Sequence, residues 1–286
     1  LGFWIPDPFG APQQLPSSLS ARLRDALPLP YRDLPVNDGT RVQVADVDGD
    51  GDTDLVVANR GDGEITILLN DGTGTSYVSI DVDSQPNLAG NADPLDVYVG
   101  DLDLDGDDDT DLLVARPEGL VIYWNEDGRL ELEDQGVGCV DGVPVDVAVA
   151  DVNDDGFADV FVSCFVSRDA FRSGVFNDPG NVAPNRLLLG AEDGWTDATE
   201  AWQLAGSQNT FTASFVDLDL DDRVDLVVAN DTGRIELYHH DGERYSLFGL
   251  DGYGFWMGVA VGDLDADGDQ DLVFSNVGNS IPARLV

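Results

Sequence analysis

Aspartates at alternate positions recur in five short loops of this chain, and these are residue types that bind a hard cation. The first loop is Asp46-Val-Asp48-Gly-Asp50-Gly-Asp52-Thr-Asp54, and the others begin at Asp101, Asp151, Asp217 and Asp263. Carboxylates at alternate positions of a tight turn converge on one point, which suits Ca²⁺ because this ion takes six to eight oxygen ligands. We therefore expect up to five bound Ca²⁺ ions. Magnesium fits less well, because it needs short octahedral bonds and keeps several waters.

Five positions in each loop are the predicted metal ligands. With the first aspartate as position 1, positions 1, 3, 5 and 9 are acidic or amide in every copy. Position 7 includes Phe157 and Arg223, which are not anionic, so we expect this position to coordinate through its backbone carbonyl. The predicted ligands are Asp46, Asp48, Asp50, Asp52 and Asp54; Asp101, Asp103, Asp105, Asp107 and Asp109; Asp151, Asn153, Asp155, Phe157 and Asp159; Asp217, Asp219, Asp221, Arg223 and Asp225; and Asp263, Asp265, Asp267, Asp269 and Asp271.

The loops match the first nine positions of an EF-hand loop but not its end. An EF-hand needs a bidentate glutamate at position 12, where the first loop has Val57 inside a predicted strand. Position 6 is glycine in four loops and Asp222 in loop four, so we expect loop four to be the weakest site. Loop two is two residues longer, so either Asp109 or Asp111 is its last ligand. Acidic turns without metal are the alternative, which the shared register of the five copies disfavours.

Short β-rich runs flank every loop and would hold it in place. One strand precedes each loop, and a second, such as Leu55-Val-Val-Ala58, follows it. A third strand leads to an Asp-Gly pair such as Asp71-Gly72, which is a strong hairpin signal because glycine accepts a positive φ. A fourth strand closes the unit. Four antiparallel strands in repeats of about 50 residues predict an all-β fold, a β-propeller with one blade for each repeat.

The repeats begin near residues 41, 95, 145, 211 and 256, which places the propeller at residues 41–286. The third repeat carries an insertion at residues 166–184, and such insertions often carry binding functions. Residues 1–40 are rich in proline, and we interpret them as an N-terminal arm. The fifth repeat has three strands here, so we expect either residues 29–36 to supply a fourth or another segment or partner to cover the edge.

Composition restricts the partners and the compartment. The net charge is −42, and like charge disfavours nucleic acid and anionic membranes as partners. No apolar run approaches the ~18 residues of a membrane helix, so we expect no direct membrane insertion. Cys139 and Cys164 either form a disulfide, as in exported proteins, or stay two buried thiols. We expect an extracellular, cell-surface or periplasmic location.

The loop core Asp-x-Asp-x-Asp-Gly-x-x-Asp-Leu resembles the FG-GAP/VCBS repeat family, and the resemblance covers residues 41–286. Asn185-Arg-Leu-Leu188 and Met257-Gly-Val-Ala-Val-Gly-Asp263 are similar to the cartilage-acidic-protein branch of that family. The resemblance implies an integrin-α-like, calcium-stabilised β-propeller, commonly seven-bladed, in an acidic extracellular protein. The chain would then be a five-bladed ring or part of a seven-bladed one.

The remaining residues favour binding over catalysis. His239 and His240 are adjacent, and adjacent residues on a strand face opposite ways, so the pair does not bind one metal from a regular strand. The sequence has no Ser-His-Asp order, phosphate loop or lysine base. We therefore expect a non-enzymatic calcium-binding propeller that mediates protein–protein contact or assembly. The alternative is a glycan-active propeller, either a lectin or a polysaccharide lyase with a tyrosine base.

Overall fold

The computed structural model describes residues 4–5, 13–14, 36, 39–59, 63–73, 77–82, 94–102, 110–126, 129–134, 138–174, 179–192, 194–206, 208–248, 252–277 and 284–285. Within these ranges the chain is strands and connections, apart from helix α2 (Arg168–Ser173) and a 3-10 turn (Pro179–Asn181). The prediction of an all-β, mainly antiparallel fold is therefore confirmed. Most of the predicted arm at residues 1–40, including residues 29–35 of the predicted closing strand, lies outside the described residues.

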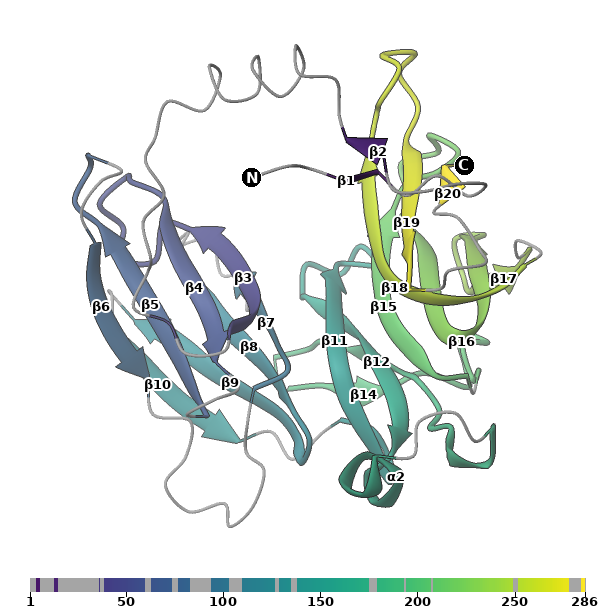
Figure 1. Ribbon diagram of the computed structural model, residues 1–286, viewed down its shortest axis with the longest axis horizontal. Coiled ribbons are helices and arrows are strands. Elements are labelled where there is room, and N and C mark those ends of the chain that lie inside the picture. Colours follow the sequence, from purple (N-terminus) through teal and green to yellow (C-terminus); the bar gives the residue numbers. More distant parts are fainter. Residues whose placement is uncertain are drawn as a thin grey trace.

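Three antiparallel meanders of four strands follow one another along the chain (Figure 1). The first contains β3 (Gly39–Ala45), β4 (Asp54–Asn59), β5 (Glu64–Asn70) and β6 (Tyr77–Val82). The second contains β7 (Asp96–Gly100), β8 (Asp111–Arg116), β9 (Gly119–Glu126) and β10 (Arg129–Asp134). The third contains β11 (Gly142–Ala150), β12 (Asp159–Ser167), β13 (Arg186–Leu189) and β14 (Thr196–Asp197). Each has the strand order predicted for one repeat.

The fourth large sheet combines strands that the sequence divides between two repeats. It contains β15 (Thr210–Val216), β16 (Asp225–His240), β17 (Tyr245–Leu247), β18 (Tyr253–Gly262), β19 (Asp271–Asn276) and β20 (Arg284–Leu285). The long strand β16 pairs with β15, β17 and β18, and the last pairing joins Asp231 to Phe255. Five separate blades are thus not confirmed, because the described residues form four large sheets and the small pair β1 (Trp4–Ile5) and β2 (Gln13–Gln14).

The first strands of successive repeats lie next to one another around a common axis. β3 contacts β7, β7 contacts β11, β11 contacts β15, and β15 contacts β18. Figure 1 shows the sheets in chain order, with β6 and β17 at the outer sides of the molecule. Sheets that radiate from an axis in this way form a β-propeller.

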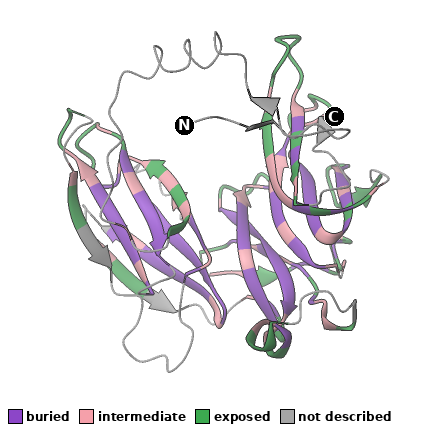
Figure 2. Ribbon diagram, in the orientation of Figure 1, coloured by how far each residue is buried: buried purple, intermediate pink, exposed green. Residues whose placement is uncertain are grey.

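Apolar side chains packed between neighbouring sheets form the core, and Figure 2 shows the buried residues concentrated in the middle strands. One cluster joins the first sheet to the second, through residues such as Ile67 and Leu112. Others join the second sheet to the third and the third to β15 and β16. A fourth joins β16 to β18 and β19, through residues such as Leu237 and Phe274. Middle strands therefore bury both faces, which explains their nearly continuous apolar sequences.

The third repeat carries two further features. Cys139 and Cys164 form a disulfide, one of the two alternatives that the sequence left open, and both side chains are buried. In the insertion, Ser167 caps α2 by accepting a hydrogen bond from the Ala170 amide at 3.3 Å, and Gly174 ends the helix with a φ of 70°. None of the helices in the described ranges has the length and hydropathy of a membrane span.

Candidate metal centres

The four described acidic loops share one backbone shape. Loops one, three, four and five connect the first and second strands of their repeats, and each has left-handed backbone at positions 4 and 6. These φ values are 72° at Gly49, 57° at Asp154, 60° at Leu220 and 63° at Ala266 for position 4, and 91° at Gly51, 87° at Gly156, 66° at Asp222 and 99° at Gly268 for position 6. The turn at position 6 was predicted. The turn at position 4 was not, because leucine and alanine rarely adopt this conformation.

The position-1 carboxylate holds the turn together. In loop one the Asp50 amide donates to Asp46 Oδ1 at 3.1 Å, and the Gly51 amide donates to Asp46 Oδ2 at 2.8 Å. The same pair of bonds is made by Asp151, Asp217 and Asp263. The loop therefore folds around its first aspartate through its own backbone amides.

Position 7 has the same peptide orientation whatever its side chain. The amides of Asp52, Phe157, Arg223 and Asp269 all donate to the position-5 carboxylate of their own loop, at 2.9 to 3.2 Å. A backbone-carbonyl ligand at this position requires such a shared orientation, so the observation fits the predicted division between side-chain and backbone ligands.

The position-9 aspartate braces the loop against the third strand. Asp54 is fully buried, and it accepts hydrogen bonds from the Val47 amide at 2.9 Å and from the Asn70 amide at 2.8 Å. Asp159 and Asp225 make the equivalent bonds. In loop two this position is taken by Asp111, which accepts from the amides of Leu102 and Asn125, both at 2.9 Å. Asp103, Asp105, Asp107 and Asp109 lie outside the described residues.

Two groups of carboxylates each bring three oxygen donors close enough together to hold one metal ion. The ligand oxygens of Asp46, Asp48 and Asp50 lie within 4.8 Å of one another, as do those of Asp263, Asp265 and Asp271. Desolvation and the nearby Asp50 carboxylate raise the pKa of Asp48. A hydrogen bond with Asp267 and its negative charge raise the pKa of Asp269. Crowded carboxylates that resist ionisation are stabilised by a cation, and an all-oxygen set fits Ca²⁺.

Loop three has a buried carboxylate and an amide among its predicted ligands. The pKa of Asp159 is raised to about 6, chiefly by burial and also by the carboxylates of Asp155 and Asp151, against the lowering effect of two backbone hydrogen bonds. The Asn153 amide group donates to Asp155 at 2.8 Å, while its oxygen accepts from the Asp155 amide at 3.0 Å. This loop therefore has the same turn with one less negative charge at position 3.

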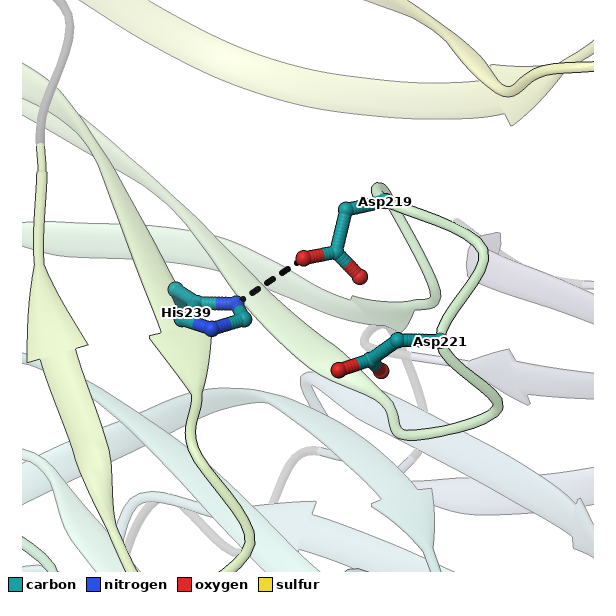
Figure 3. Close-up of side chains that lie close together, drawn as sticks. All are labelled: Asp219, Asp221 and His239. Atoms are coloured by element: carbon teal, nitrogen blue, oxygen red, sulfur yellow. Dashed lines mark ion pairs between the residues drawn. The ribbon is translucent and has the colours of Figure 1, made fainter.

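Loop four differs from the others because a histidine and an arginine contact its carboxylates. Figure 3 shows the His239 ring facing Asp219 and Asp221, and its Nδ1 lies 3.4 Å from Asp219 Oδ2. The guanidinium of Arg223 donates to Asp221, and so a cationic side chain uses a carboxylate oxygen that the prediction assigns to metal. His240 is buried and packs against the rings of Trp202 and Tyr245, so the two adjacent histidines have different neighbours, as expected for adjacent strand residues.

His239 was not among the predicted site residues. It belongs to the end of β16, directly before the turn at Asp241-Gly242, where the third strand of the repeat returns to its acidic loop. The position of His239 close to that turn was the sequence signal that could have identified it as a residue beside the acidic loop. In the first repeat Leu69 stands at the position of His239, and the bond that the Asn70 amide donates to Asp54 is matched here by the His240 amide, which donates to Asp225.

Comparison with known proteins bears on the repeats and the fold. The family described as FG-GAP-like repeat matches residues 46–109, 103–162 and 217–274. A solved structure of BBS1N in complex with ARL6DN, soaked with mercury, shares the fold with a TM-score of 0.50 at 17% identity, over 89% of this chain and 66% of that one. The same complex soaked with lead gives a TM-score of 0.36 at 12% identity, over 86% and 93% of the two chains.

No curated protein sequence matches the chain. The family matches contain all four described loops, and together they cover more than half of the 286 residues. They agree with the loop core, the four-stranded meanders and the radial order of the sheets. The chain therefore belongs to the FG-GAP-like repeat family.

Proposed function

We propose that this chain is a calcium-binding β-propeller that acts outside the cell as a scaffold for protein–protein contact and has no enzymatic activity. The observation that carries the proposal is the all-oxygen grouping of carboxylates in loops that share one hydrogen-bonded turn. Bound Ca²⁺ would neutralise these carboxylates and add oxygen–metal bonds between residues of each loop. Loops one and five are the strongest candidates, and loop four is the weakest because of Arg223.

An extracellular or periplasmic location is supported by the disulfide between Cys139 and Cys164. Disulfides persist in oxidising compartments and are rare in the cytosol of most organisms. The strongly acidic composition agrees with the branch of the family that resembles cartilage acidic protein, which we keep as part of the proposal.

The scaffold role is supported by the fold and by the charge of the chain. A β-propeller of FG-GAP-like repeats offers a broad, rigid surface, and the BBS1N structure with the same fold is in complex with ARL6DN. We propose five repeats, because four apolar clusters link the first strands β3, β7, β11, β15 and β18 in sequence. The proposal includes two forms of the ring: a five-bladed ring, or a seven-bladed ring of which this chain supplies five repeats.

Three experiments test the function. A calcium titration repeated with Mg²⁺ should give saturable binding of Ca²⁺ and much weaker binding of Mg²⁺. A glycan array and a lyase assay, which follows the absorbance of unsaturated products from acidic polysaccharides, should both be negative. Product formation that is lost with a tyrosine variant would instead establish the glycan-active alternative.

A further inference from the structure

We propose that the cavity on the propeller axis binds a small organic cation, an ammonium group carried on an apolar or aromatic body. The cavity has a volume of about 870 Å³. This size is within the range of roughly 300–1,000 Å³ that is usual for small-molecule sites. The inference goes beyond the proposed function, because it concerns neither calcium nor a protein partner.

The cavity is built from equivalent positions of the successive repeats. Its inner wall contains the residue five positions before each acidic loop, namely Arg41, Asp96, Asp146, Thr212 and Gly258. Helix α2, from the insertion in the third repeat, contributes to the lining. In the third repeat the acidic loop directly precedes β12, and α2 directly follows β12. The helix and the metal loop of that repeat therefore lie at opposite ends of this strand. The cavity is therefore separate from the candidate metal centres.

The arginine in the wall is already neutralised. Arg41 forms ion pairs with both Asp96 and Asp146. These two carboxylates also accept hydrogen bonds from the amides of the next inner strands, Asp96 from Val147 at 3.0 Å and Asp146 from Ala213 at 2.9 Å. One guanidinium against two buried carboxylates leaves no positive charge for an anionic ligand. The ion pairs and hydrogen bonds of Asp96 and Asp146 instead link neighbouring inner strands to one another.

Asp231 is the charged group of the cavity that lacks a counter-ion. It lies in β16, lines the cavity, and forms no ion pair with any residue in the part of the chain that the structure describes. Burial raises the pKa of its carboxyl group, and a hydrogen bond from the Thr232 amide lowers it. The other arginine of the lining, Arg172, is paired with Glu118 at 3.2 Å. A ligand cation would therefore compensate a carboxylate that the described residues leave without one.

Three phenylalanines give the ligand its apolar contact. Phe165 and Phe211 meet edge to face with ring centroids 5.7 Å apart, and Phe171 of α2 packs against the same cluster. Aromatic faces attract cations and bury apolar groups, and a bare metal ion would use neither property. The carboxylate and the aromatic wall together select an organic cation.

The test is calorimetric titration of the calcium-saturated chain with three probes of matched body and different charge. They are 2-phenylethylammonium, neutral 2-phenylethanol and anionic 3-phenylpropanoate. The ammonium probe should bind saturably at one site, at least about tenfold more tightly than the alcohol, and the anion more weakly than both. Equal affinity for the ammonium and the alcohol, or no saturable ammonium binding, would overturn the proposal. This result needs only the natural chain and no substituted variant.

Two substitutions locate the site. Asp231→Asn should reduce ammonium affinity by at least about tenfold and leave the alcohol unchanged. Asp169→Asn is the matched control, because it removes the same charge from an exposed position of α2 outside the lining, and it should leave the affinity within about twofold. Equal losses in both variants would mean general attraction to an acidic protein, which contradicts a specific site.

Discussion

The aspartates of each loop have two different structural duties. Those at positions 1 and 9 accept backbone hydrogen bonds that shape the turn and fix it to the third strand, as Asp46 and Asp54 do. Those at positions 3 and 5 also accept a backbone amide from their own loop, but they lie nearer to solvent and give the cluster its charge, as Asp48 and Asp50 do. Substitutions at the two kinds of position should therefore respond differently to calcium.

The substitution Asp265→Ala tests whether the position-3 aspartate acts through metal binding. Metal binding to the folded state adds about 2.7 kcal/mol for each site when free calcium is a hundredfold above Kd. The substitution should lower the melting temperature with calcium present and change it much less in chelator, as followed by scanning calorimetry. Asp54→Ala is the control and should destabilise the chain in both conditions, because it removes two buried backbone hydrogen bonds. Equal losses for Asp265→Ala with and without calcium would indicate a packing role.

The axial carboxylates predict a pH dependence that is separate from the loops. Burial, followed by the nearby Asp96 charge, raises the pKa of Asp146 to about 7, against the lowering effect of Arg41. A carboxyl group with a raised pKa binds its proton more tightly in the folded state, so its stabilising contribution is present at low pH and lost as pH rises through about 7. The stability of the natural chain relative to Asp146→Asn should therefore fall between about pH 4 and pH 7. Denaturant unfolding at a series of pH values measures it, and a pH-independent difference would contradict the assignment.

Among the elements, the strands beside the loops could be predicted and the pairing between repeats could not. Runs such as Leu55-Val-Val-Ala58 are apolar because two neighbouring sheets cover the strand, and this local pattern is visible in the sequence. The link between β16 and β18 depends on Asp231 and Gly233 pairing with a distant strand, which no local pattern encodes. The residues that line the axis could not be predicted either. Arg41, Asp96 and Thr212 occupy equivalent positions of their repeats but have different side chains, so they form no recognisable motif.

The disulfide should be the main covalent support of the third repeat. It connects residues 25 apart, and both sulfurs lie in the core between the second and third sheets. Closing a loop of this size stabilises a folded chain by about 2–4 kcal/mol. The double variant Cys139→Ala, Cys164→Ala should lose about that amount in denaturant unfolding, and a reductant should then have no further effect. A variant as stable as the oxidised natural chain would show that the link is dispensable.

For the whole molecule, the sheets follow one another around the axis, and each covers an apolar face of the one before it. Val47, Leu102 and Val152 follow the first aspartate of their loops, and they are 7%, 3% and 3% exposed. Leu264 holds the same position in loop five and is 61% exposed. The sequence gives these four residues one pattern, so their different burial is a property of the assembled fold.

This difference predicts unequal costs for one substitution at two equivalent sites. Leu102→Ala should destabilise the chain by about 2–5 kcal/mol, because it creates a cavity between two sheets. Leu264→Ala should cost less than about 0.5 kcal/mol, because the side chain is exposed. Denaturant unfolding of the two variants makes the comparison. Similar costs would mean that another segment covers the face of the last repeat in solution.

The central claim is that the acidic loops bind calcium and that this binding stabilises the propeller. The most direct measurement is a calorimetric titration of the chelator-treated chain with Ca²⁺, followed by thermal melting with and without EGTA. The account predicts saturable binding of up to five ions, one for each acidic loop, and a higher melting temperature with calcium. Absence of binding heat together with an unchanged melting temperature in EGTA would contradict it.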